Sequence, residues 1–263
     1  MMMNKPRFAL VTGAGSGIGL ATAGRLVKAG WRVALVDVNG EALARAAADL
    51  GPASLPFTCD LSDAAAVEAL MQAIGAASGG KLDLLVNNAG LLWSGHFKDQ
   101  TPQSIARITT VNTMALAICT RLAFPLLKAS ADAGGKPVVI NLSSASAAAG
   151  IPSLAIYSAS KFWVRGFTEA LAVEWRGQGI AVRDVMPPFV HTPMMAGNAA
   201  ANPFHVRLGA NLSADDVARS IVSSIQGGPL HRYMTLQLQF TRLLIALLPG
   251  SWTRRALSAI GGY

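Results

Sequence analysis

Short apolar segments alternate with alanine-rich segments of helical length along most of this chain, and this alternation restricts the possible folds more than any other feature. We expect strands within residues 8–15, 32–38, 55–62, 82–90, 136–146 and 180–188, separated by helices. These strands are apolar throughout, as in sheets that are covered on both faces. Strands joined by crossover helices form right-handed βαβ units. The sequence therefore predicts an α/β fold with a doubly wound parallel sheet and helices on both faces.

The chain has 263 residues, of which 52% are apolar and 14% are charged. This length and composition are typical of one large domain with a buried sheet. We expect this domain to span residues 1–228 and to include a Gly-, Asn- and Pro-rich substrate loop at about residues 194–212. After the loop, Ser213 and Asp216 have the spacing of a helix N-cap and its capping-box partner. Residues 229–263 form an apolar and basic extension that we expect to pack on the same domain.

The sequence TGAGSGIG, residues 12–19, follows the first expected strand and opens the first helix. Glycine lets the backbone turn tightly and lets a pyrophosphate approach the N-terminus of the helix. This context, more than the glycines alone, indicates a dinucleotide site of the Rossmann type. The cofactor contacts expected here are Gly13, Gly15, Ser16, Gly17, Ile18 and Gly19.

Asp37 ends the second expected strand. A carboxylate at this position accepts hydrogen bonds from the ribose hydroxyls of adenosine and repels a 2′-phosphate. No arginine or lysine stands at Ser16, Val38 or Asn39 to reverse this preference. The sequence therefore favours NAD over NADP as the cofactor.

Tyr157 and Lys161, in the sequence YSASK, would lie one turn apart on the same face of a helix. A neighbouring ammonium group favours the phenolate and lowers the pKa of a phenol from its usual value of ~10. Such a phenol is suited to proton exchange near neutral pH. From these two residues alone, an incidental pair on a surface helix is the simpler interpretation. Other motifs in the chain are needed to decide between an incidental pair and a catalytic one.

Taken together, the motifs resemble those of the short-chain dehydrogenase/reductase family over roughly residues 7–195. They are TGAGSGIG, CDL at 59–61, NNAG at 87–90, Asn112, INLSS at 140–144, YSASK at 157–161 and PPFVHTPM at 187–194. Their order, and the spacing of Ser144 before Tyr157, make the resemblance specific. It implies a Rossmann-type, NAD-binding domain that transfers a hydride.

The resemblance also implies a role for each matching residue. Tyr157 would be the general acid/base for the substrate oxygen, and Ser144 would hold the same oxygen. Lys161 would lower the pKa of Tyr157 and bind the nicotinamide ribose, and Asn112 would kink its helix and hold a water in a proton relay. Further cofactor contacts would come from Asp37, Cys59, Asp60, Leu61, Asn87, Ala89, Gly90, Val111, Tyr157, Lys161, Pro187, Val190 and Thr192.

The chain departs from the family pattern in two places. Pro187 and Pro188 stand where the family has Pro-Gly, which fixes φ and removes a donor on the nicotinamide side. Residues 229–263 replace the usual closing strand and its tetramer-forming motif. By resemblance, we expect a homodimer through the helices that carry Asn112 and Tyr157, or a homotetramer.

Residues 236–248 of the extension, LQLQFTRLLIALL, form an expected helix that Pro249 ends. It is too short to span a bilayer, and no other stretch of the chain is expected to span one. Three interpretations stay open: a lid or a contact with a partner copy, an ordinary core helix, or a peripheral contact with a membrane surface. Trp252 and the arginines around it suit the last of these.

Methionine and aromatic side chains in loops suit bulky apolar ligands. We expect substrate contacts from Trp93, Ser146, Phe189, Met194, Met195 and Phe204. The expected function is therefore an NAD(H)-dependent oxidoreductase for a lipophilic secondary alcohol or ketone of steroid, retinoid or fatty-acyl type. One alternative is an NADPH-dependent carbonyl or 3-oxoacyl reductase, against which Asp37 argues. Another is a non-catalytic, cofactor-binding regulator, which would not need the Ser144–Tyr157–Lys161 set.

The net charge of +8 comes from scattered basic residues without dense runs, so nucleic acid is not an expected partner. Cys59 and Cys119 have neither metal-type spacing nor a disulfide framework, which fits a reducing compartment. No metal is expected, because no histidine has a partner at ligand spacing. The short apolar run at Phe8–Val11 is no signal-peptide core, so the expected location is cytoplasmic.

Overall fold

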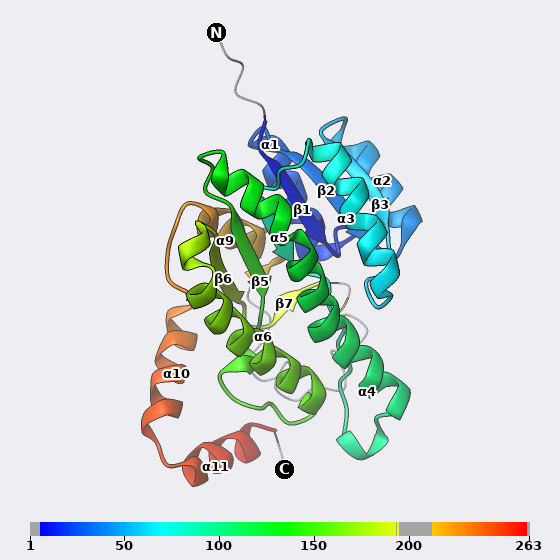
Figure 1. Ribbon diagram of the computed structural model, residues 1–263. Helices are drawn as coiled ribbons and strands as arrows, with labels where there is room; N and C mark the ends of the chain where they lie inside the picture. Colours follow the sequence, from blue (N-terminus) through cyan, green and yellow to red (C-terminus); the bar gives the residue numbers. More distant parts are fainter. Residues whose placement is uncertain (1–5, 193, 195–211, 262–263) are drawn as a thin grey trace.

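The computed structural model describes residues 6–192, 194 and 212–261, and its centre is a seven-stranded parallel sheet (Figure 1). The sheet order is β3–β2–β1–β4–β5–β6–β9. These strands are β1 (Phe8–Thr12), β2 (Arg32–Asp37), β3 (Ser54–Thr58), β4 (Leu84–Asn87), β5 (Val138–Leu142), β6 (Ala181–Met186) and β9 (His231–Tyr233). The order reverses at β1, which pairs with β2 on one side and β4 on the other. The expected Rossmann-type, doubly wound sheet is confirmed, and ligands of such sheets bind beyond the carboxyl ends of the strands at this reversal.

Helices cover both faces of the sheet because successive strand residues enter opposite apolar layers. Phe8 and Leu10 lie in the layer with α3 (Ala64–Ser78), α5 (Leu116–Asp132) and α6 (Ala155–Glu174). Ala9 and Val11 lie in the layer with α1 (Gly17–Lys28), α2 (Gly40–Leu50) and α9 (Ala214–Ile225). Both layers consist of buried apolar side chains, which explains why the strands are apolar at nearly every position.

The strand β9 was not among the six expected from the sequence, because its three residues contain no apolar run. The expectation that residues 229–263 replace the closing strand was therefore wrong, since β9 lies within them and pairs in parallel with β6. Its His231 pairs with Asp184 of β6 in the backbone register. The His231 ring also lies between two carboxylates, with Nδ1 2.8 Å from the buried Asp184 and Nε2 2.9 Å from Glu169 of α6. Tertiary contacts rather than local propensity therefore define this strand.

Between β4 and β5 the helical structure is a continuous run of three parts: α4 (Pro102–Thr109), the π-helical η2 (Thr110–Ala115) and α5. Within the described ranges, this run is the one helix that is long and apolar enough to cross a membrane by length and composition. The sequence had predicted no such helix. Its side chains at Ile108, Cys119 and Leu127 are buried within the domain. A buried core helix of a globular domain can have the same length and apolar composition.

The C-terminal segment forms two helices, α10 (Leu236–Leu247) and α11 (Gly250–Gly261). The expected helix before Pro249 is confirmed, and α11 is an addition to the expectation. Figure 1 shows both, in orange and red, at the end of the molecule opposite the N-terminus. The expected capping box of α9 is also confirmed, since the Ser213 and Asp216 side chains each accept a hydrogen bond from the backbone N–H of the other residue.

The remaining elements are short. Among the described residues they are the 3₁₀ turns η1 (Phe97–Asp99), η3 (Ala145–Ala147) and η4 (Arg176–Gln178), and a two-stranded sheet of β7 (Val190–His191) and β8 (Leu212–Ser213). The strand β7 follows β6 by a few residues and brings the segment up to Thr192 to the carboxyl edge of the main sheet.

Candidate functional site

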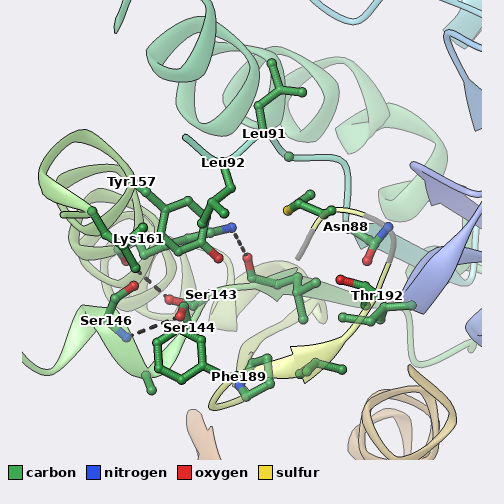
Figure 2. A pocket seen from close by; sticks show the side chains of 18 of the residues that line it. Asn88, Leu91, Leu92, Ser143, Ser144, Ser146, Tyr157, Lys161, Phe189 and Thr192 are labelled. Atoms are coloured by element: carbon green, nitrogen blue, oxygen red, sulfur yellow. Dashed lines mark hydrogen bonds between the residues drawn. The ribbon is translucent and has the colours of Figure 1, made fainter. Parts of the chain in front are cut away.

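A cavity of about 670 Å³ opens at the carboxyl edge of the sheet, between the loops after β1, β2, β4, β5 and β6. Helices α10 and α11 close part of it. Of the residues expected from the sequence, those that line it are Gly13, Ser16, Gly17, Ile18, Asp37, Cys59, Asp60, Leu61, Ala89, Gly90, Val111, Ser144, Ser146, Tyr157, Lys161, Pro187, Phe189, Val190, Thr192 and Met194. Figure 2 shows Tyr157, Lys161 and Ser144 grouped on one side of the cavity, with Asn88 and Thr192 across from them.

The glycine turn after β1 needs glycine for both conformation and space. Gly13 and Gly17 have φ values of +66° and +53°, which residues other than glycine rarely adopt. Gly19 belongs to α1, and a Cβ there would lie 2.1 Å from the carbonyl oxygen of Gly13. Gly15 and Gly19 do not line the cavity themselves, but they let the turn and the helix approach each other.

The carboxylate of Asp37 is held at the cavity edge by backbone donors. Its Oδ2 accepts from the N–H of Gly15 at 2.9 Å, and its Oδ1 accepts from the N–H of Asn39 at 3.0 Å. These bonds fix the carboxylate beside the glycine turn, where it can meet the hydroxyl groups of a ligand.

A second carboxylate, Asp60, lies on the same wall. Hydrogen bonds from the backbone and hydroxyl of Ser62 lower the pKa of Asp60, and the charge of Arg107 lowers it further. Arg107 also lines the cavity, and sequence analysis missed it. It lies on α4, and no motif marks it.

At the other end of the cavity, Ser144, Tyr157 and Lys161 converge from β5 and α6 (Figure 2). The Nζ of Lys161 donates to the carbonyl of Leu142 at 2.8 Å and lies 5.5 Å from the centre of the Tyr157 ring. The Oγ of Ser144 accepts from the N–H of Ser146 at 3.2 Å. The helix α6 thus presents the phenol and the ammonium group from one face, one turn apart, as expected.

The pKa values of this pair follow burial. Burial raises the pKa of Tyr157 to about 12, although the hydrogen bond with Ser144 acts in the opposite direction. Burial also lowers the pKa of Lys161 to about 8, because a buried ammonium group loses hydration. The expected lowering of the Tyr157 pKa by Lys161 is not found in this arrangement: burial raises that pKa, and Tyr157 holds its proton.

Asn112 lies behind the cavity rather than on its wall. Its Oδ1 accepts from the N–H of Leu91 at 2.7 Å, and its Nδ2 donates to the carbonyl of Leu91 at 2.9 Å and to the Oγ of Ser160 at 3.1 Å. Ser160 in turn donates to the carbonyl of Tyr157. In the π-helical segment, Asn112 therefore ties the loop after β4 to the helix that carries Tyr157.

The structure does not bring Asn87 and Trp93 to the cavity. The Asn87 side chain is buried in the core, where its Nδ2 donates to Thr120 of α5 and to Asn141 of β5 at 2.9 Å. The next residue, Asn88, lines the cavity instead. Trp93 packs over Gly95. Met195 and Phe204 lie outside the described residues.

Pro188 stands where the family has glycine, and a backbone hydrogen bond is present at the neighbouring Pro187. The carbonyl of Pro187 accepts from the N–H of Ala145 at 2.8 Å, next to Ser144. Pro188 itself lines the cavity.

Several cavity residues come from segments without a recognised motif. The C-terminal helices and the strand end before them contribute Thr235, Gln237, Leu238, Thr241, Ile245 and Leu257. A lid was one of the interpretations of this segment from the sequence, but no residue pattern indicates which face of α10 points inward. Of the described residues, no group of three or more His, Cys, Asp and Glu is arranged to hold a metal ion.

Comparisons with known proteins agree with this site. The profile of the family described as short chain dehydrogenase matches residues 7–203. D-threitol dehydrogenase of Mycolicibacterium smegmatis is 35% identical over 192 residues, which cover 72% of each chain. The 3-beta-hydroxysteroid dehydrogenase of Comamonas testosteroni is 36% identical over 191 residues, 72% of this chain and 73% of that one.

Among solved structures, the 3-ketoacyl-(acyl-carrier-protein) reductase of Brucella melitensis, complexed with NADH, is 34% identical. It superposes with a TM-score of 0.77 over 82% of this chain and 89% of that one. The dinucleotide-type turn, the Ser144–Tyr157–Lys161 group and these similarities agree, and the chain belongs to the short-chain dehydrogenase family.

Proposed function

We propose that this oxidoreductase interconverts a lipophilic secondary alcohol and its ketone with NAD(H). One observation carries the proposal: Ser144, Tyr157 and Lys161 meet at one end of a cavity whose other end holds the fixed carboxylate of Asp37. A proton-transfer group and a ribose-binding group thus share one cavity, as hydride transfer from a dinucleotide requires.

The residues at the Asp37 end fit a dinucleotide. The turn at Gly13 and Gly17 presents backbone rather than side chains to the cavity, next to the N-terminus of α1. A Cβ at Gly13 would lie 2.8 Å from Nδ2 of Asn88, so this close approach is specific to glycine. When bound, a nicotinamide cofactor supplies the acceptor or donor of the hydride.

The chain's own residues supply the proton. With a pKa raised to about 12, Tyr157 carries its proton at neutral pH and can donate it to a ketone oxygen. In the reverse direction the phenolate takes the hydroxyl proton of the alcohol, and the positive charge of Lys161 favours this form. Ser144 holds the reacting oxygen in either direction.

Two features support NAD over NADP. The Asp37 carboxylate is already oriented by Gly15 and Asn39, and it would repel a 2′-phosphate. The Brucella reductase similar to this chain was crystallised with NADH. The exposed Val38 beside Asp37 offers no compensating positive charge.

The apolar wall at the Tyr157 end supports a lipophilic substrate. It includes Leu91, Leu92, Ile151, Leu154 and Phe189. The α10 residues Leu238 and Ile245 extend it. The similar 3-beta-hydroxysteroid dehydrogenase fits this inference, whereas D-threitol, a polyol, belongs to the other relative.

The alternative is an NADPH-dependent carbonyl or 3-oxoacyl reductase. The similarity to the Brucella 3-ketoacyl reductase favours its substrate class, although that protein was complexed with NADH. Such a reductase needs the same Tyr157 and Ser144, so the two functions differ in substrate and cofactor. A non-catalytic regulator remains the third hypothesis, against which the intact proton-transfer group argues.

We also infer a cytoplasmic homodimer or homotetramer. Met114 of η2 and Phe162 and Trp163 of α6 are 55%, 42% and 40% exposed, so helices near the site carry an apolar face that a second copy could cover. Residues 1–228 would form the catalytic part, with the substrate loop at about 194–212, and residues 229–263 a lid.

The test is to mix the protein with NAD⁺ and a panel of lipophilic secondary alcohols and to follow NADH formation. Tyr157→Phe should lower turnover by about 10³-fold, because general acid/base catalysis contributes 10²–10⁴-fold, yet bind NADH as the wild type does. Small polyols and NADPH with a 3-oxoacyl thioester serve as parallel arms. Turnover of polyols alone would overturn the substrate class, and NADH binding without turnover of any substrate would favour the regulator.

A further inference from the structure

The C-terminal helix α10 has two faces with different surroundings. Its inner face, with Leu238, Thr241 and Ile245, lines the cavity. Its outer face carries Leu236, Phe240, Leu243 and Leu247, which are separated by four, three and four positions and so form one stripe along the helix. These four side chains are 82%, 62%, 49% and 73% exposed.

The apolar surface continues beyond the stripe. Leu248, after the end of α10, is 42% exposed, and Trp252 of α11 is 62% exposed. Several large exposed apolar side chains in one segment mark a surface that a protein partner or a membrane covers. An indole ring at the border of such a surface is typical of contacts with the headgroup region of lipids.

The charge of this segment is one-sided. Residues 229–263 contain four arginines and no acidic residue, so they carry half of the chain's net charge of +8. Arg254 and Arg255 of α11 are exposed, and Arg242 lies 5.1 Å over the ring of Tyr233. An apolar stripe beside arginines, without any carboxylate, is complementary to an anionic lipid surface.

A second copy of the chain fits this surface less well. A symmetric contact across α10 and α11 would gather the arginines of both copies in one interface, with no acid from either segment to neutralise them. The apolar face at Met114, Phe162 and Trp163 lies on other helices and carries the inferred oligomer contact.

We propose that α10 and α11 dock the enzyme on an anionic phospholipid surface, with the stripe Leu236–Phe240–Leu243–Leu247 and Trp252 entering the boundary between headgroups and acyl chains. Because the opposite face of α10 is a wall of the cavity, docking brings the substrate end of the cavity to the lipid phase. The last step, transfer of a lipophilic substrate from lipid to cavity, rests on the proposed function, whereas docking itself does not.

The test is flotation of the full-length protein with vesicles of phosphatidylcholine alone and of equal parts phosphatidylcholine and phosphatidylserine. We expect flotation with the anionic vesicles and much less with the neutral ones. Phe240→Gln with Leu247→Gln should weaken binding by roughly tenfold or more, because two apolar side chains no longer enter the lipid. Arg254→Gln and Arg255→Gln should each weaken it about fivefold.

Val173→Gln is the matched control, because Val173 is an apolar residue of α6 that is 77% exposed and distant in sequence from the stripe. Thermal unfolding of every variant checks that it folds. Absence of flotation with both vesicles, or equal flotation of the Phe240/Leu247 variant and the wild type, would overturn the proposal. A lower oligomeric mass of that variant by light scattering, without vesicles, would overturn it in favour of a contact between copies.

A second measurement locates the contact. Vesicles that contain brominated phosphatidylcholine should quench part of the tryptophan fluorescence, and Trp252→Phe should remove most of this quenching. Unchanged quenching in Trp252→Phe would contradict insertion of this end of the surface. Both readouts are independent of turnover, so an inactive but vesicle-bound protein would count against the proposed reaction and not against docking.

Discussion

The two ends of the cavity are built in different ways. At the nucleotide end, the wall is backbone: a glycine turn, with Asp37 held by two N–H donors. At the other end, called here the α10 end, the wall includes the inner face of α10, whose outer face is exposed. A wall made of backbone admits few substitutions, whereas a wall of one helix tolerates many. We therefore expect the first end to bind a ligand common to many proteins and the second end to vary with the substrate.

The strongest way to break the nucleotide end is Gly19→Ala. The new Cβ would lie 2.1 Å from the Gly13 oxygen, so the turn must shift. Overpacking of this kind costs about 1–3 kcal/mol, and we expect NADH to bind roughly ten- to a hundredfold more weakly in fluorescence titration. The control is Gly166→Ala on α6, where a Cβ meets nothing within 4 Å. Unchanged NADH affinity in Gly19→Ala would contradict a dinucleotide at this turn.

A milder change at the same end is Asp37→Asn, which keeps an oxygen for the Gly15 N–H but removes the charge. The ratio of kcat/KM for NADH to that for NADPH should fall about tenfold, since hydrogen bonds to charged groups are worth about 1.5–3 kcal/mol. Steady-state kinetics with both cofactors measures the ratio. A ratio equal to that of the wild type would rule out the ribose-binding role of Asp37.

The α10 end is tested by Ile245→Ser on the inner face of α10. Loss of an apolar contact should lower kcat/KM for a lipophilic alcohol about fivefold and leave NADH affinity unchanged. Val173→Ser makes a similar change on an exposed part of α6 and should have no effect. If NADH affinity fell together with kcat/KM, the two ends would not be independent, and the comparison would fail.

The smallest expected effect concerns the edge strand β9, which precedes α10 and contacts β6 and α6. Burial opposes the charge of His231, but Asp184 and Glu169 together raise its pKa, and Arg165 acts against them. A raised folded-state pKa stabilises the fold below the unfolded pKa of about 6.5, and this contribution is lost as the pH rises through the folded value. Burial also raises the pKa of Asp184, so its contribution to the stability of the fold likewise decreases as the pH rises.

The melting temperature of the wild type should therefore fall more steeply from acidic to alkaline pH than that of His231→Gln. Thermal unfolding at several pH values gives both slopes, and comparison of slopes removes the constant cost of the substitution. Parallel curves for the two proteins would show that His231 does not bind an extra proton on folding.

Sequence alone predicted those parts of the molecule where short-range chemistry decides the structure. The glycine turn, the capping box of Ser213 and Asp216, and the face shared by Tyr157 and Lys161 follow from local geometry. The strand β9, in contrast, depends on carboxylates from β6 and α6, and the π-helical turn at Asn112 depends on bonds to Leu91 and Ser160. Asn87 and Asn88 illustrate the limit: where the strand ends decides which of two identical side chains enters the cavity and which the core.

The buried chain of amides and hydroxyls has a consequence for how the reactive groups keep their geometry. Asn87 joins Thr120 and Asn141, and Asn141 donates to Thr168 at 2.9 Å, so directional bonds link β4 and β5 to α5 and α6. Apolar contacts tolerate small slides of a helix along a sheet, whereas directional hydrogen bonds between buried side chains favour one arrangement. The network is not complete, because the buried Oδ1 of Asn87 has no hydrogen-bond partner within the described part of the chain. A misplacement of the reacting groups by about 1 Å can cost about 10²-fold in rate. The network therefore helps to keep the catalytic groups in place when the surrounding aliphatic residues are substituted.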